Sequence, residues 1–100
     1  MSSSLPLIVT GTYTGTTAAL SVTTGFKPDW IIAWNQTDGD TMYWWTSGMT
    51  STVVALITTA VASQSSTVTP SDRGFSLPAS DSVINENGKV YIYMAGQSGN

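Results

Sequence analysis

Residues 81–95 have the sequence DSVINENGKVYIYMA, and this stretch decides the expected fold. Asn87 and Gly88 are the residue types that tolerate the positive φ angles of a type I′ turn. After the turn, aliphatic residues at even positions alternate with aromatic and small residues at odd positions, which is the period of a β-strand. The pattern predicts a hairpin in which residues 82–84 pair with residues 89–95.

Outward from this hairpin, short runs of β-branched and aromatic residues recur between turn-forming residues. We expect strands at residues 7–13, 18–23, 30–35, 41–46 and 75–77, and a short run from Val68 that Pro70 stops. Residues 50–61 fit a helix face or a buried strand, and we choose the strand. Gly25, Pro28 and Gly39 mark turns between the runs. About eight strands predict an all-β fold, an antiparallel β-sandwich of jelly-roll-like type.

The chain is expected to form one domain over residues 1–100, with polar tails at about 1–4 and 97–100. A chain of this length has room for one modest hydrophobic core. The first residues lack the positive charge of a signal peptide, and the longest apolar run is far too short to span a membrane. We therefore expect no membrane partner.

Composition restricts the chemistry more than it restricts the fold. The chain has three basic and six acidic residues, no histidine and no cysteine, against 30 serines and threonines. Without histidine or cysteine, the commonest general base, nucleophile and metal ligands are missing. The only cations, Lys27, Arg73 and Lys89, make no basic stripe for a phosphate backbone. We expect no enzyme activity, no cofactor, no resident metal and no direct contact with nucleic acid.

Carboxylates are the remaining candidates for a site. A pair for glycoside hydrolysis would have to come from six residues: Asp29, Asp38, Asp40, Asp72, Asp81 and Glu86. The Asp38-Gly39-Asp40 loop offers oxygen ligands to Ca²⁺, but two carboxylates fall short of the six to eight oxygens that this ion takes. A plain turn accounts for this loop, and an Asn-Gly turn accounts for residues 85–88.

Tryptophan provides the candidate contact residues. Trp44 and Trp45 are adjacent on an expected strand, so their side chains point to opposite faces and one of them leaves the core. That residue is packed on its own sheet, buried at a subunit interface, or stacked on a sugar. Sugar binding would draw on the polar residues nearby in sequence, which are Asn35, Gln36, Asp38 and Asp40. Leu5 and Leu7 are further interface candidates. The apolar segment that contains them follows a polar tip, and it either adds a strand to a neighbour's sheet edge or begins the first strand of its own sheet.

Three short elements carry a resemblance to a known family. Residues 25–35 (GFKPDWIIAWN), 74–77 (GFSL) and 85–88 (NENG) are similar to elements of small β-modules in virion proteins of tailed bacteriophages. The resemblance covers roughly residues 11–95. It implies a β-sandwich that trimerises or docks on a larger assembly, with no catalytic residues to carry over. We expect no collar, coiled coil or second domain of the kind that accompanies such modules in long fibres, which favours a stand-alone subunit.

The expected function is therefore that of a phage virion structural protein. The favoured role is a head decoration or cement subunit on the particle exterior, a homotrimer that bridges major capsid proteins after synthesis in the host cytoplasm. A tail, baseplate or fibre-tip module with tail proteins as partners is the first alternative. A carbohydrate- or receptor-binding domain is the second.

Overall fold

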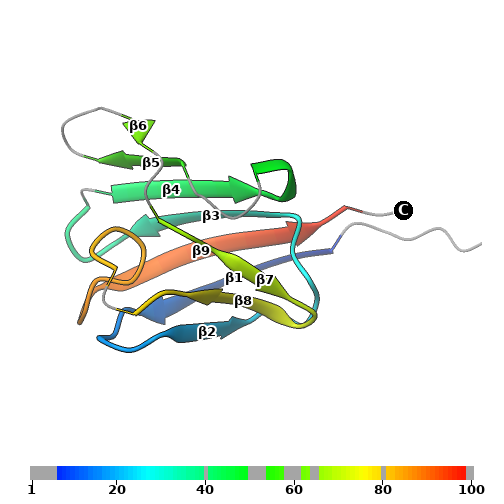
Figure 1. The fold of residues 1–100 in the computed structure, drawn as a ribbon, viewed down its shortest axis with the longest axis horizontal. Helices are drawn as coiled ribbons and strands as arrows, with labels where there is room; N and C mark the ends of the chain where they lie inside the picture. The colour runs from blue at the N-terminus through cyan, green and yellow to red at the C-terminus, as the bar shows by residue number, and fades with distance from the viewer. Residues whose placement is uncertain are drawn as a thin grey trace, which may run out of the picture.

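The computed structural model describes residues 7–39, 41–49, 66–79 and 81–98, together with the backbone of 54–57 and 62–63. The regular structure in these residues is almost entirely β-strand, and the strands form two antiparallel sheets packed face to face (Figure 1). A 3₁₀ turn, η1 (Ser47–Met49), follows the fourth strand. The prediction of an all-β antiparallel sandwich is confirmed.

The larger sheet has six strands in the order β1-β9-β3-β4-β5-β6. Their bounds are Leu7–Thr14 for β1, Val90–Gln97 for β9, Trp30–Asn35 for β3, Thr41–Thr46 for β4, Val54–Ile57 for β5 and Ala62–Ser63 for β6. The first and last strands of the described chain are thus neighbours. Strands β3 to β6 follow one another as a meander, whereas a jelly roll interleaves two Greek keys.

The smaller sheet has three strands in the order β2-β8-β7, with bounds Leu20–Thr23, Gly74–Leu77 and Thr69–Ser71. In Figure 1 it lies in front of the β1 and β9 side of the larger sheet. The side chains between the two sheets form the core. One face of each sheet is therefore buried, and the opposite face of the larger sheet points away from the smaller one.

Several predicted strands match the observed ones closely. The expected bounds of 30–35 and 41–46 coincide with β3 and β4, and 7–13 and 75–77 each fall one residue short of β1 and β8. The strand chosen for 50–61 is confirmed at β5, and the rest of that range lies mainly outside the described residues. β9 ends at Gln97, which was expected to lie in the C-terminal tail.

The predicted C-terminal hairpin is wrong. Residues 82–84 form a turn, because one carboxylate oxygen of Asp81 accepts hydrogen bonds from the backbone N–H groups of Val83 (2.8 Å) and Ile84 (3.1 Å). This local capping outcompetes strand pairing. The turn at residues 86–89 does form, with the Lys89 N–H donating to the Glu86 carbonyl at 3.1 Å. It connects the loop to β9, whose partners are β1 and β3.

Pro70 was expected to stop a strand, and it lies within β7 instead. Proline has no N–H to contribute to a sheet, so it is found on edge strands, where one side needs no partner. β7 is the edge strand of the smaller sheet, and its register pairs Pro70 with Phe75 of β8.

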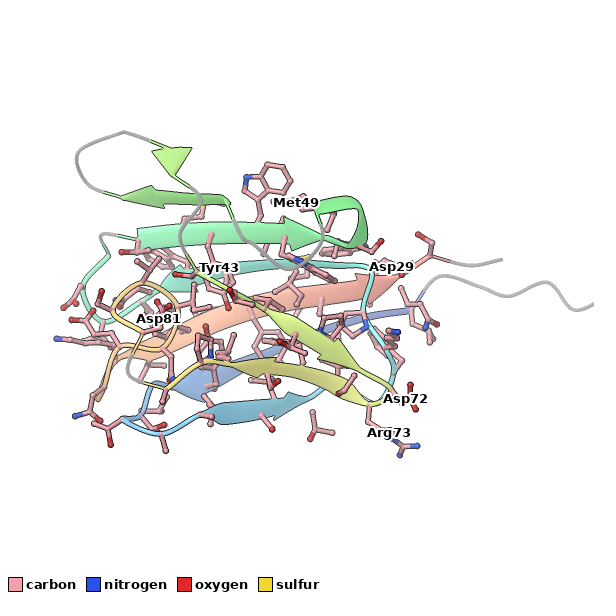
Figure 2. All side chains as sticks on the ribbon, in the orientation of Figure 1. Asp29, Tyr43, Met49, Asp72, Arg73 and Asp81 are labelled. Carbon is pink, nitrogen blue, oxygen red and sulfur yellow. The ribbon has the colours of Figure 1, made fainter. Side chains whose placement is uncertain are left out.

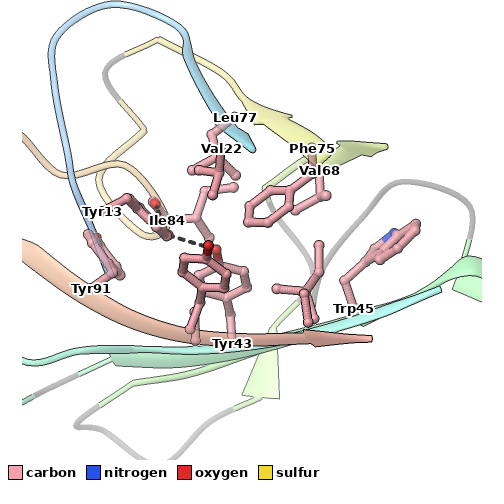
Figure 3. Packing of buried hydrophobic residues seen from close by; sticks show 13 residues of the cluster. Tyr13, Val22, Tyr43, Trp45, Val68, Phe75, Leu77, Ile84 and Tyr91 are labelled. Carbon is pink, nitrogen blue, oxygen red and sulfur yellow. Dashed lines mark hydrogen bonds between the residues drawn. The ribbon is translucent and has the colours of Figure 1, made fainter. Parts of the chain in front are cut away.

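The core is rich in aromatic residues (Figure 3). Tyr13 and Tyr91 stack with ring centroids 4.8 Å apart and an interplanar angle of 7°, and the Phe75 ring meets Tyr93 edge-on at 5.8 Å. The buried apolar residues of the core are Tyr13, Val22, Ile31, Ala33, Tyr43, Trp45, Val68, Phe75, Leu77, Ile84, Tyr91, Tyr93 and Ala95. Rings in such contacts contribute beyond their buried area.

Candidate functional site

The face of the larger sheet that points away from the core is the most distinctive surface of the molecule, and we call it the outer face. The strand registers place its side chains in rows across β1, β9, β3 and β4. Its residues are Ile8, Thr10, Thr12, Thr14, Val90, Ile92, Met94, Gly96, Trp30, Ile32, Trp34, Met42, Trp44 and Thr46. None of these fourteen residues is charged.

Large apolar side chains on the outer face are exposed. Trp34 and Met94 expose 44% and 42% of their surface, and Ile8 exposes 63%. Ile32, Met42, Trp44 and Ile92 each expose 39–40%. An exposed apolar residue is ordinary when it stands alone, but a continuous patch of this kind marks an interaction surface. The outer face is therefore the candidate functional site.

A shallow hollow lies within the outer face, between β1, β9 and β3. Its volume is about 210 Å³, and it is lined by Thr10, Ile32, Ala33, Trp34, Ile92, Tyr93 and Met94. Thr10 is smaller than the other outer-face residues of this lining, so side chains fill the least space on the β1 side of the hollow. An apolar hollow of this size has room for one large side chain of a partner.

The Trp30 indole marks the end of this face. It lies over Gly96 on the neighbouring strand, in the space that a Cβ atom at position 96 would occupy. Glycine is thus required there for close approach of the ring, and Gly96 is buried beneath it.

The two adjacent tryptophans divide between the faces as predicted. Trp44 is on the outer face, whereas Trp45 is 1% exposed and belongs to the core. Trp45 is therefore wrong as an interface candidate, because its side chain is not accessible to a partner. Leu7 is 45% exposed at the start of β1, one position from Ile8 and on the opposite face of the strand. Leu5 lies outside the described residues.

Strand registers also reveal residues of this surface that sequence reasoning missed, namely Ile32, Trp34, Met42, Ile92 and Met94. A signal was present, since residues 30–34 are apolar without alternation and both sets of alternating residues in 90–95 are apolar. Such runs are typical of strands that are covered on both faces. β1, β9 and β3 lie side by side through long-range strand pairing, which local sequence patterns do not predict.

The buried side of the same sheet carries a tyrosine network. The Tyr13 hydroxyl donates to the Ile84 carbonyl at 2.7 Å and lies 2.7 Å from the Tyr43 hydroxyl. Because a hydroxyl has one proton, Tyr43 donates to Tyr13. Burial raises the pKa of both hydroxyls well above the ordinary value, chiefly by desolvation. Both are therefore neutral, and they fasten the loop at Ile84 to the larger sheet.

The charged residues that the structure describes lie toward the two ends of the sandwich. Figure 2 shows Asp29, Asp72 and Arg73 at one end and Asp81 at the other. At the Asp81 end, the Lys89 ammonium pairs with an Asp38 carboxylate oxygen at 3.1 Å, and both side chains are about 30% exposed. This distribution keeps charge away from the outer face.

The candidate carboxylates have structural partners. Asp81 accepts from the Ser66 hydroxyl at 2.9 Å and caps its own turn, and Asp29 accepts from the Ser98 N–H at 2.8 Å. The Asn35 amide nitrogen lies 3.5 Å from both Asp38 and Glu86, so one side chain connects these two acids. Asp40 lies outside the described residues. Among the described residues, no three acidic side chains gather where they would hold a metal ion.

The sugar hypothesis needed polar groups beside an exposed tryptophan. Asn35 is fully buried on the core side of β3, whereas Trp44 lies on the other face of the sheet. The Asn35 side-chain oxygen accepts a hydrogen bond from the Asp38 N–H at 3.0 Å. Asn35 therefore does not lie beside the exposed rings. The turn that follows it lies nearer to them, since a Cβ atom at Gly39 would be 3.8 Å from the Trp34 ring.

The predicted turn residues lie in the connections between strands. Gly25, Gly39 and Gly88 have φ angles of +94°, +71° and +81°, in the left-handed region. Asn87 is exposed in the turn before β9, and Pro28 is buried in the loop before β3.

The chain matches no protein-family model, and it shows no significant match to a curated protein or to a solved structure. In the part of the chain that the structure describes, no helix has the length and apolar character needed to cross a membrane. Conclusions about function therefore depend on the surface itself.

Proposed function

We propose that this chain is a structural subunit that acts by burying its outer face in an assembly. The observation that carries the proposal is the uncharged apolar outer face, on which seven large side chains each expose at least 39% of their surface. Aromatic residues and methionine are enriched at protein interfaces, and charged residues are depleted from interface cores. The composition of the outer face follows that pattern.

The class of assembly that we propose is a phage virion, with head decoration or cement as the role. The resemblance of residues 25–35, 74–77 and 85–88 to virion modules supports this choice. The proposed mechanism is mechanical. Many copies of the subunit bury apolar surface against their neighbours in the shell, and many weak contacts made together resist rupture.

Immunogold electron microscopy of intact particles from cells that produce the chain tests this function. Label over the whole head is the expected result. Label confined to the tail would overturn the decoration role in favour of a tail or baseplate module. Particles without label, from a preparation whose cell extract contains the chain, would overturn the virion proposal altogether.

A glycan array distinguishes the sugar-binding alternative. Trp34 and Trp44 are exposed on one face, whereas Asn35 is buried on the core side of β3. We expect no bound glycan and no change in tryptophan emission when host polysaccharide is added. A saturable emission change that Trp44→Ser abolishes would favour a receptor-binding domain instead.

A further inference from the structure

We propose that the outer face is occupied by the outer face of a second copy of this chain, related by a two-fold axis that runs along the strands between β9 and β3. The inference deepens the proposed function, since it names the partner of the same surface. Three observations carry it: the charge of the face, its area and its relief.

Charge allows copies to meet through this face. The chain has a formal net charge of −3, so a contact that places its acidic residues against those of a second copy is disfavoured. The fourteen residues of the outer face carry no charge, and the labelled acidic residues lie at the two ends of the sandwich. The outer face is thus a broad surface that meets its own copy without like charges opposed to one another.

The exposed area is sufficient for a pair. Seven large side chains that each expose at least 39% of their surface leave on the order of 600 Å² accessible, at roughly 200 Å² for a fully exposed side chain. Two such faces bury on the order of 1,200 Å², which reaches the lower end of stable protein interfaces. Threonines and the partly buried Trp30 and Val90 add to this area.

The relief of the face is complementary to itself. β1 contributes the small residues Thr10 and Thr12, whereas β4, at the far side of the described face, contributes Met42 and Trp44. A two-fold axis along the strands places β1 of one copy opposite β4 of the other and β9 opposite β3. Tall residues then meet short ones, which is how packed layers interdigitate.

The same axis assigns an occupant to the hollow. β3 of one copy lies over β9 of the other, so Trp34 of the second copy reaches the 210 Å³ hollow beside Ile92 and Met94. Two-fold symmetry makes this insertion reciprocal. The arrangement differs from the homotrimer predicted from the sequence resemblance, and the mass of the oligomer separates the two.

Sedimentation velocity of the purified chain over a concentration series is the test. We expect a species of twice the 10.5 kDa chain mass that dissociates on dilution. As it dissociates, tryptophan emission should shift to the red, because Trp34 and Trp44 become exposed to water. A monomer at every concentration, or a trimer, would overturn the inference.

Two matched variants locate the contact. Ile92→Lys places a charge at the centre of the outer face, and we expect it to weaken self-association by about tenfold or more. Leu7→Lys makes the same change of charge at a residue of similar exposure on the opposite face of the larger sheet, and we expect the wild-type dimer. Equal weakening by both variants would place the contact elsewhere and overturn the inference.

The outcomes for pairing and for function are distinguishable. If the chain is a dimer in solution but immunogold labels no particle, the virion proposal is overturned and the pairing remains in place. Labelled heads together with a monomer in solution would overturn the pairing and leave the virion proposal in place. The dilution experiment uses only the wild-type chain, so it decides the pairing even where a variant fails to fold.

Discussion

Asn85 connects three separate stretches of chain through one fully buried amide. Its side-chain oxygen accepts from the Thr16 N–H at 2.8 Å, and its nitrogen donates to the carbonyls of Ala18 (3.0 Å) and Pro78 (2.9 Å). The oxygen and the nitrogen of this buried amide therefore both have hydrogen-bond partners, as buried polar groups require. The residue that sequence reasoning assigned to a turn is also a core residue at the Asp81 end of the sandwich.

We predict that Asn85→Ala lowers the free energy of unfolding by roughly 2–3 kcal/mol, because it leaves buried backbone groups without partners. Asn85→Asp should cost a similar amount near neutral pH, since its second oxygen would face the two carbonyls. Urea denaturation measures both. Gln36→Ala, at an exposed side chain, is the control, with an expected change within about 0.5 kcal/mol. Equal effects at 85 and 36 would contradict the role of the buried amide.

At the scale of elements, the turn before β9 depends on the backbone conformation of Gly88. Its φ is +81°, and a Cβ atom placed there would have no neighbour within 4 Å. Its N–H donates to the Gly15 carbonyl at 3.0 Å, which joins this turn to the end of β1. The cost of a side chain at this position is therefore backbone strain rather than a clash.

We predict that Gly88→Val destabilises the fold, because a β-branched residue is strained at positive φ. The strain of about 1–2 kcal/mol corresponds to a fall in Tm of roughly 5–10 °C for a domain of this size. Thermal unfolding followed by circular dichroism measures it. Gly48→Val is the matched control, since Gly48 has φ outside the left-handed region and a Cβ atom there would approach only the Thr46 Oγ1 atom, at 3.9 Å. An unchanged Tm for Gly88→Val would refute the strain.

Strand positions were predictable where local chemistry decides them. β3 and β4 follow from apolar runs bounded by Pro28 and by the Asp38-Gly39 turn, and Gly25, Gly39 and Gly88 follow from turn chemistry. The pairing of β9 was not predictable in this way. The Asn-Gly turn indicates a hairpin locally, but the Asp81 carboxylate caps the preceding residues, and β9 gains more by inserting between β1 and β3.

At the scale of the whole molecule, the candidate site was also predictable only where local sequence decides it. Adjacency of Trp44 and Trp45 was enough to predict that one of them leaves the core. It was not enough to predict the outer face, because this surface is assembled from β1, β9, β3 and β4, which are up to 90 residues apart in sequence. A sheet with an apolar surface on both sides needs a second covering layer, and one smaller sheet covers only one side.

The tyrosine network makes the stability of the whole molecule depend on alkaline pH. An unfolded tyrosine releases its proton near pH 10. Burial raises the pKa of Tyr13 and Tyr43 above that value in the folded state. The folded chain therefore keeps two protons at a pH where the unfolded chain has lost them. Linkage then lowers the free energy of unfolding as pH rises, whereas below the unfolded pKa these two groups contribute their full stabilisation.

We predict that the free energy of unfolding begins to fall near pH 10, with each of the two hydroxyls adding about 1.4 kcal/mol per pH unit to the slope. Urea denaturation at pH 8, 9, 10 and 11 measures it. Tyr43→Phe removes one titrating group and leaves the Tyr13 bond to the Ile84 carbonyl in place. This variant should therefore lose about half of the slope that the pair contributes. A slope above pH 10 that Tyr43→Phe leaves unchanged would show that other groups control alkaline unfolding.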